Sequence, residues 1–201
     1  MRKQPSEKKK NVLGIAIAAV IAITMIGLTF SSVPFLGSQQ QNVERFNGFE
    51  VVQGQTGYQV EVDSQVFSFL THPADAAGVS AEPAAVQKLR SARMVYLTSN
   101  FTDAQAPAIA AAQFSLHRIL QRQNTYAETA FTAPNAAGLK VITCANASAT
   151  VPVLLFRSAN ETTSVSMEGS CIIATARSAS SFARIADRFG YELLGVLGNG
   201  Q

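Results

Sequence analysis

The stretch SASSFARIADRFGYELLGVL, residues 178–197, decides the fold. Its apolar side chains recur every three or four residues, the spacing that places them on one face of an α-helix. They are Phe182, Ile185, Ala186, Phe189, Leu193 and Val196. Charged side chains lie on the opposite face: Arg184, Asp187, Arg188 and Glu192. We therefore expect a helix with one face packed on a sheet and the other in water. Gly190 inside it indicates a close backbone contact or a bend, because glycine costs about 1 kcal/mol against alanine in a helix.

The sheet for this helix is predicted from short apolar runs that precede it. The expected strands are residues 94–97, 126–131, 139–143, 151–156, 163–167 and 171–174. Nearer the start, residues 49–70 alternate apolar and polar side chains around Gly54 and Gly57, which predicts a three-stranded antiparallel meander.

Two further helices are expected between the strands. One opens at Ser80 with Pro83 in its first turn and turns Val86 and Leu89 inward. The other is capped by Thr102 or Asp103. Its inward residues are Ile109, Ala112, Leu116, Ile119 and Leu120, and its polar residues are Gln113, His117, Arg118 and Gln121. Strand groups separated by one-sided helices predict an α+β or mixed α/β domain over residues 48–201.

The other decisive feature is residues 12–30, which contain no charged side chain and follow five basic residues. Extended to Leu36, this run is long enough to cross a hydrocarbon core of about 30 Å. Because basic residues are retained on the cytoplasmic side, we expect residues 1–11 to be a cytoplasmic tail and residues 12–36 a transmembrane signal-anchor helix. Residues 37–47 are expected to form a polar stalk that carries an extracytoplasmic domain. A cleaved secretory signal is the alternative, although its apolar region is normally shorter.

The net charge of +3 does not describe the domain. Five of the 16 basic and one of the 13 acidic residues lie in the first ten, which leaves the remainder near −1. Lys88, Arg90 and Arg93 form the one loose basic group in the remainder. A nucleic-acid partner is not expected, because such a surface needs many clustered Lys and Arg. The basic tail is instead expected to contact anionic lipid headgroups.

Two cysteines, Cys144 and Cys171, lie in the part expected outside the cell. Each lies at the end of a predicted strand, and the outer face of a membrane is oxidising, so a disulfide between them is expected. The alternatives are two separate buried thiols or a redox-active pair, although reactive pairs favour Cys-x-x-Cys spacing.

The order of residues around these cysteines is similar to that of a known group. The matching stretches are residues 142–147, 151–153, 160–162 and 171–173, followed by the closing helix. With the amino-terminal span, they resemble uncharacterised archaeal proteins anchored by a single membrane span. The resemblance covers the last third of the domain and the anchor. It implies a cell-surface location and a shared paired-cysteine fold, and no activity.

Three Asn-x-Ser/Thr triplets begin at Asn100, Asn146 and Asn160. Each is a possible glycosylation site, and an attached glycan would require its loop to be exposed.

No catalytic, cofactor-binding or metal-binding motif is recognised. His72 and His117 lack a nucleophile or carboxylate at motif spacing, and we expect both to be solvated. Glu61 and Asp63 are expected on a solvated strand face. The hypothesis is therefore an extracytoplasmic binding or assembly module that contacts an envelope protein or a surface polymer. The alternatives are a surface hydrolase with a dispersed active site and a subunit of a surface structure.

Overall fold

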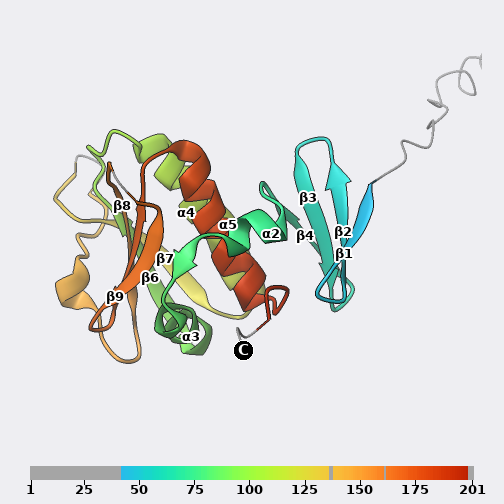
Figure 1. Ribbon diagram of the computed structural model, residues 1–201. Coiled ribbons are helices and arrows are strands. Elements are labelled where there is room, and N and C mark those ends of the chain that lie inside the picture. Colours follow the sequence, from blue (N-terminus) through green and yellow to red (C-terminus); the bar gives the residue numbers. More distant parts are fainter. Residues whose placement is uncertain (1–41, 136–137, 161, 199–201) are drawn as a thin grey trace, which may run out of the picture. The chain divides into compact units, whose positions relative to one another are not determined.

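The computed structural model describes residues 42–135, 138–160 and 162–198. These residues form a mixed α/β domain with two sheets and four α-helices (Figure 1). Residues 1–41, which include the expected tail, the expected span and the first five residues of the expected stalk, lie outside the described residues. Within the described residues, every helix is too short or too polar to cross a membrane.

The first sheet is an antiparallel meander in the order β1-β2-β3-β4. Its strands are β1 (Val43–Phe46), β2 (Phe49–Gly54), β3 (Gly57–Val62) and β4 (Gln65–Phe69). Positive φ angles at Asn47 and Gly48, and again at Asp63 and Ser64, make the tight turns that join neighbouring strands. Gly57 has no room for a side chain, because a Cβ there would lie 2.1 Å from the Phe69 carbonyl oxygen.

The meander corrects two expectations. It has four strands rather than three, and the added strand, β1, lies within the expected stalk of residues 37–47. The physical reason is the Asn47-Gly48 pair, whose φ angles of 49° and 87° reverse the chain and pair Val43–Phe46 with β2. The folded domain therefore begins before residue 48.

The second sheet has the order β5-β9-β10-β8-β6-β7. Its strands are β5 (Ser80–Ala81), β6 (Met94–Ser99), β7 (Tyr126–Phe131), β8 (Val153–Ser158), β9 (Ser164–Glu168) and β10 (Cys171–Ala176). Strands β7, β6, β8 and β10 run parallel, whereas β9 is antiparallel to β10. The four helices are α2 (Pro73–Ala77), α3 (Pro83–Ser91), α4 (Ala106–Arg122) and α5 (Ala179–Leu193).

Helices α4 and α5 lie side by side over one face of the six-stranded sheet (Figure 1). The core between them is built from residues that the apolar spacing predicted, with Leu97, Leu154 and Ile172 supplied by the sheet. Helix residues Ile109, Leu116, Phe182, Ile185 and Phe189 are fully buried against these strands. The predicted helices and most predicted strands are thus confirmed to within a few residues. The predicted caps are wrong, because Ser80 lies in β5 and α3 is capped by Glu82, while α4 is capped by Gln105 rather than by Thr102 or Asp103.

Helix α5 is buried on a second side as well. Tyr191 stacks on Phe69 of β4 with ring centroids 3.8 Å apart, and Leu194 and Val196 join the same cluster under the meander. The close contact expected at Gly190 is confirmed, because a Cβ there would lie 2.5 Å from Ile119 and 2.7 Å from Phe69.

The polar face expected for α5 is therefore not solvated. Asp187 and Glu192 are only 1% and 6% exposed. The Arg188 guanidinium pairs with Glu192 at 2.7 Å and also donates to the carbonyl of Ala77 at the end of α2. Gln113 of α4, another predicted polar-face residue, is 4% exposed. Polar periodicity alone did not show that further elements pack on these faces.

The other face of the six-stranded sheet is covered by the segment that leads into β8. Here Val153, Cys171 and Ile173 form a small cluster with Cys144, whose short 3-10 helix (Cys144–Asn146) lies above the strands. The expected strand at residues 139–143 is wrong, since this segment makes only an isolated bridge between Phe131 and Val141. It is held by two backbone hydrogen bonds with Phe131 and by side-chain contacts, such as the bond from Thr98 Oγ1 to the Ile142 carbonyl at 2.8 Å.

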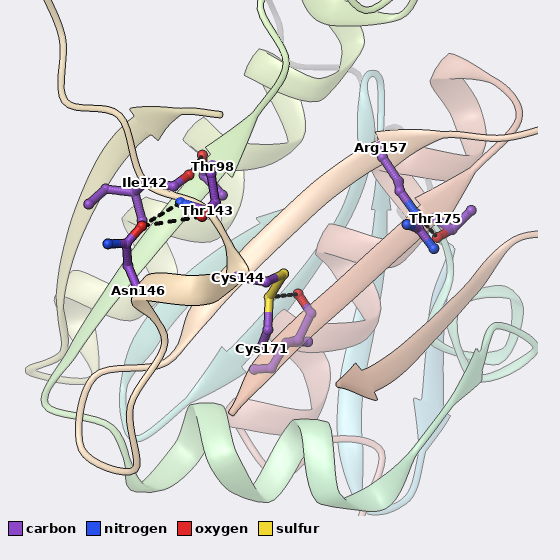
Figure 2. The surroundings of a disulfide bond; sticks show 9 residues. Thr98, Ile142, Thr143, Cys144, Asn146, Arg157, Cys171 and Thr175 are labelled. Carbon is purple, nitrogen blue, oxygen red and sulfur yellow. Dashed lines mark hydrogen bonds between the residues drawn. A yellow bond between two sulfur atoms is a disulfide. The ribbon is translucent and has the colours of Figure 1, made fainter. Parts of the chain in front are cut away.

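The expected disulfide is present (Figure 2). Cys144 and Cys171 are joined with their Cα atoms 5.2 Å apart and 27 residues apart in sequence. The bond connects the covering segment to the first residue of β10.

Candidate functional site

The two histidines that the sequence offers as acid-base groups lie in different environments. His117 is half-buried on α4. His72 is not the solvated loop residue that we expected, because its side chain is only 16% exposed and caps α2. Its ring packs edge-on against Tyr58 and Phe46. The sequence signal for this cap is His72-Pro73, since proline at the first helical position places the preceding residue at the cap.

His72 shares a pocket of about 270 Å³ with Glu44 and Tyr58. Its Nδ1 accepts a hydrogen bond from the Ala74 backbone N–H at 3.2 Å, so in the neutral ring the proton is on Nε2. That Nε2 lies 3.4 Å from Glu44 Oε2. Nδ1 is thus engaged, whereas Nε2 is buried and makes no hydrogen bond to the described residues.

Glu61 and Asp63 are exposed, as expected. Within the described residues, no group of three or more His, Cys, Asp or Glu side chains is placed to hold a metal ion.

The carboxyl edge of the parallel strands is where α/β sheets commonly bind ligands. Asp103 lies there, and its carboxylate accepts bonds from the Ser158 N–H at 3.0 Å, the Ser158 hydroxyl at 2.7 Å and the Gln105 N–H at 2.8 Å. Burial acts to raise the pKa of Asp103, but these hydrogen bonds outweigh it and lower the pKa. The carboxylate therefore joins the turn after β6 to the end of β8, which is a structural role.

The least expected group is Asp187, a carboxylate buried in the domain. Its Oδ2 accepts three bonds, from the Leu70 N–H at 3.0 Å, the Thr71 N–H at 2.7 Å and the Thr71 hydroxyl at 2.8 Å. No described basic side chain forms an ion pair with it. Burial raises the pKa of Asp187 to about 6, and the hydrogen bonds from Thr71 and Leu70 offset only part of this rise.

Asp187 holds the chain where it leaves the meander. Tyr191, one turn later on α5, donates its hydroxyl to the Thr71 carbonyl at 2.8 Å. Burial, followed by the nearby charge of Asp187, raises the pKa of this phenol. Asp187 and Tyr191 together satisfy the backbone of residues 70–71.

Asp187 also lies at one end of an open cavity of about 310 Å³ between α4 and α5. We call this cavity the α4–α5 groove. Its walls are small side chains from both helices, namely Ala108, Ala111, Ala112, Ser115, Ala179, Ser180, Ala183 and Ala186. Leu70 also lines the groove and is 62% exposed. The groove is therefore mostly apolar, with two serine hydroxyls in its walls and a carboxylate at one end.

Sequence reasoning missed this groove, although a signal for it was present. Ala108, Ala111, Ala112 and Ser115 recur at helical spacing, as do Ala179, Ala183 and Ala186. Small residues at such spacing let two helices approach closely, but the pairing of α4 with α5 is not encoded in either repeat alone.

The three predicted glycosylation sites lie on exposed turns. Asn100 follows β6, Asn160 follows β8, and Asn146 ends the short helix beside the disulfide. All three asparagines are exposed.

No protein-family model, curated protein or solved structure matches this chain. The resemblance to archaeal single-span surface proteins thus stays a prediction.

Proposed function

We propose that this protein is a membrane-anchored extracytoplasmic binding or assembly module. It is held by residues 12–36 with its amino terminus in the cytoplasm, and it contacts an envelope protein or a surface polymer through the α4–α5 groove. The observation that carries the proposal is the groove itself, an open apolar surface bordered by the exposed side chain of Leu70.

Two further features support the extracytoplasmic placement. Structural disulfides form and persist in oxidising compartments, and Cys144 is bonded to Cys171. The asparagines of all three triplets are exposed, as glycan attachment requires.

A hydrolase is the second candidate, and the pair of His72 and Glu44 in one pocket is the observation in its favour. It is the weaker candidate because Nδ1 of His72, the nitrogen that could accept a proton, already accepts the Ala74 N–H. The described residues that line this pocket also contribute no Ser, Thr or Cys as a nucleophile.

Sidedness is tested by treating sealed cells with a membrane-impermeant reagent for amines and mapping the labelled lysines by mass spectrometry. Lys140 is 58% exposed and should be labelled, whereas Lys8, Lys9 and Lys10 should be labelled only after lysis. The tail lysines thus serve as an internal control. Labelling of the tail but not of Lys140 in sealed cells would show that the orientation is reversed.

Partner binding is tested with a photoreactive amino acid in place of Ala111, an exposed residue in the groove. The matched control carries the same group in place of Ala84, an exposed alanine on α3. Irradiation of intact cells should attach one partner to the first variant and not to the second. Equal products from both positions, or none from either, would contradict the groove as the contact surface.

A further inference from the structure

The α4–α5 groove has one charged side chain among the described residues that line it, the carboxylate of Asp187. Asp187 is 1% exposed, and no described basic side chain forms an ion pair with it. Burial raises the pKa of Asp187 to about 6, so the carboxylate is still mostly ionised at pH 7. The groove therefore ends at a buried negative charge that has no cation beside it in the described part of the chain.

The two oxygens of this carboxylate have different surroundings. Oδ2 accepts all three hydrogen bonds from Leu70 and Thr71, whereas Oδ1 accepts none from the described residues. Within those residues, the fully enclosed polar side-chain atoms without a hydrogen bond belong to three other side chains, those of His72, Gln113 and Arg188. Oδ1 is therefore not fully enclosed, and the groove that Asp187 lines is the place where a ligand can reach it.

The small side chains form a track along both helices to this oxygen. Helices α4 and α5 follow strands that both run parallel to β8, and they lie over the same sheet face, so the two helices run in the same direction. Ile119 lies against Gly190. Ser115, one turn before Ile119, is therefore at about the level of Asp187, one turn before Gly190. At the other end, Ala179 lies eight positions before Asp187, which is about 12 Å along the helix axis.

An apolar track that leads to one open carboxylate oxygen matches a lysine side chain. Lysine has four methylene groups that pack on apolar surface and a compact ammonium at the end. Arginine binds a carboxylate best through two parallel bonds to both oxygens, and Oδ2 of Asp187 already has three donors. An apolar side chain would leave the buried charge without a partner. An ammonium needs only Oδ1, and the Ser115 hydroxyl in the groove wall offers it a second acceptor.

We infer that the α4–α5 groove is a binding site for a lysine side chain of the partner, whose methylene groups lie along the alanines and whose ammonium donates to Oδ1 of Asp187. This inference rests on the proposed function, in which the groove contacts a partner, and it selects an envelope protein over a surface polymer. A charge pair in the interface acts mainly on the choice of partner. The groove should therefore discriminate among side chains of similar size.

The test uses the full chain in detergent micelles at neutral pH, with ¹³C-labelled alanine methyl groups observed by NMR. The probes are three peptides, acetyl-Ala-Ala-Xaa-Ala-Ala-amide, in which Xaa is lysine, arginine or norleucine. Norleucine has an unbranched aliphatic side chain without the charge and is the matched control for lysine.

The lysine peptide should shift the methyl signals of Ala111 and Ala183 at a severalfold lower concentration than the other two peptides. The signal of Ala84, an exposed alanine on α3, should not move. In Asp187→Asn the amide keeps one oxygen for its three donors and presents an NH₂ group to the groove, so the preference for lysine should be lost. Asp63→Asn, which changes an exposed carboxylate, should retain it. Equal binding of the lysine and norleucine peptides to the wild type, or an unchanged preference in Asp187→Asn, would overturn the inference.

A second variant tests the groove without changing Asp187. Ala111→Leu adds bulk to the groove wall from an exposed position, so it leaves the core intact and should weaken binding of the lysine peptide severalfold. Ala84→Leu is its control. Unchanged binding in Ala111→Leu would show that the peptide binds elsewhere.

Photocrosslinking at Ala111 in intact cells separates the two proposals. If a protein is attached there but the peptides show no preference for lysine, the proposed function stands and the inference fails. A surface polymer attached at Ala111 would also overturn the inference and leave the proposed function standing. If nothing is attached at Ala111 while the lysine peptide binds selectively, the lysine site stands and the proposed contact surface fails.

Discussion

Asp187 shows how a residue can be stabilised by hydrogen bonds and still be costly to ionise. Its Oδ2 accepts three donors from Leu70 and Thr71, yet burial raises its pKa to about 6 from the usual 3.8. The folded state therefore binds the proton more tightly than the unfolded chain. The stabilisation from this group is complete below pH 3.8 and is lost as the pH rises through about 6.

We predict that Asp187→Asn removes this dependence. A shift of about 2 pKa units corresponds to about 3 kcal/mol of unfolding free energy in full, of which roughly 2.4 kcal/mol is lost between pH 4 and pH 7. Urea unfolding at both pH values should show a loss of this size in the wild-type protein that is absent in the variant. Asp63→Asn, which changes an exposed carboxylate, is the control. If Asp187→Asn keeps the pH dependence of the wild type, Asp187 is not the group that causes it.

Gly190 is required by packing, not by its backbone angles. We predict that Gly190→Ala destabilises the domain by about 1–3 kcal/mol, because the new Cβ overpacks the contact with Ile119 and Phe69. This loss should exceed the gain of about 1 kcal/mol in helix propensity. Thermal unfolding followed by circular dichroism measures the effect. Adding Ile119→Val removes the nearest atom, so the double variant should lose less stability than the sum of the two single changes.

At the scale of elements, the segment over the second sheet face has little regular structure of its own. It is fastened at Ile142 by Thr98 and at Cys144 by the disulfide (Figure 2). The apolar residues at 139–143 suggested a strand, but only Val141 bridges to β7. The side-chain contacts of this segment therefore supplement the two backbone hydrogen bonds of that bridge.

We predict that replacing both cysteines, Cys144→Ala with Cys171→Ala, lowers the unfolding free energy by about 3.5 kcal/mol. This is the chain-entropy value for a closed loop of this length. Urea titration of the oxidised wild type and the double variant measures the difference. Hydrogen exchange should rise most in residues 138–152. An unchanged urea midpoint would show that the other contacts of the segment are sufficient.

At the scale of the whole molecule, α4 and α5 are shared by two cores. The six-stranded sheet covers one side of the helices, and the meander packs on the ends that carry Ile119, Tyr191 and Leu194. This arrangement explains why side chains predicted in water, such as Glu192, are buried and paired. It also leaves uncovered the parts of α4 and α5 that form the groove.

Local sequence was sufficient for most of the elements, for the inward faces of the helices and for the cysteine pair. The spacing of apolar residues acts over a few positions, and it identified Leu116, Phe182 and Ile185 as core residues. The expected span and its orientation also come from the sequence alone, through the uncharged run at residues 12–30 and the basic residues before it.

Only the tertiary structure decided the burial of Asp187, the packing of His72 against Phe46 and Tyr58, and the existence of the groove. Each depends on groups more than a hundred residues apart or on elements that no short-range pattern pairs, such as Leu70 with Asp187. The periodicity of a helix shows which residues share a face. It does not show how many other elements will pack on that face, because that number depends on the path of the whole chain.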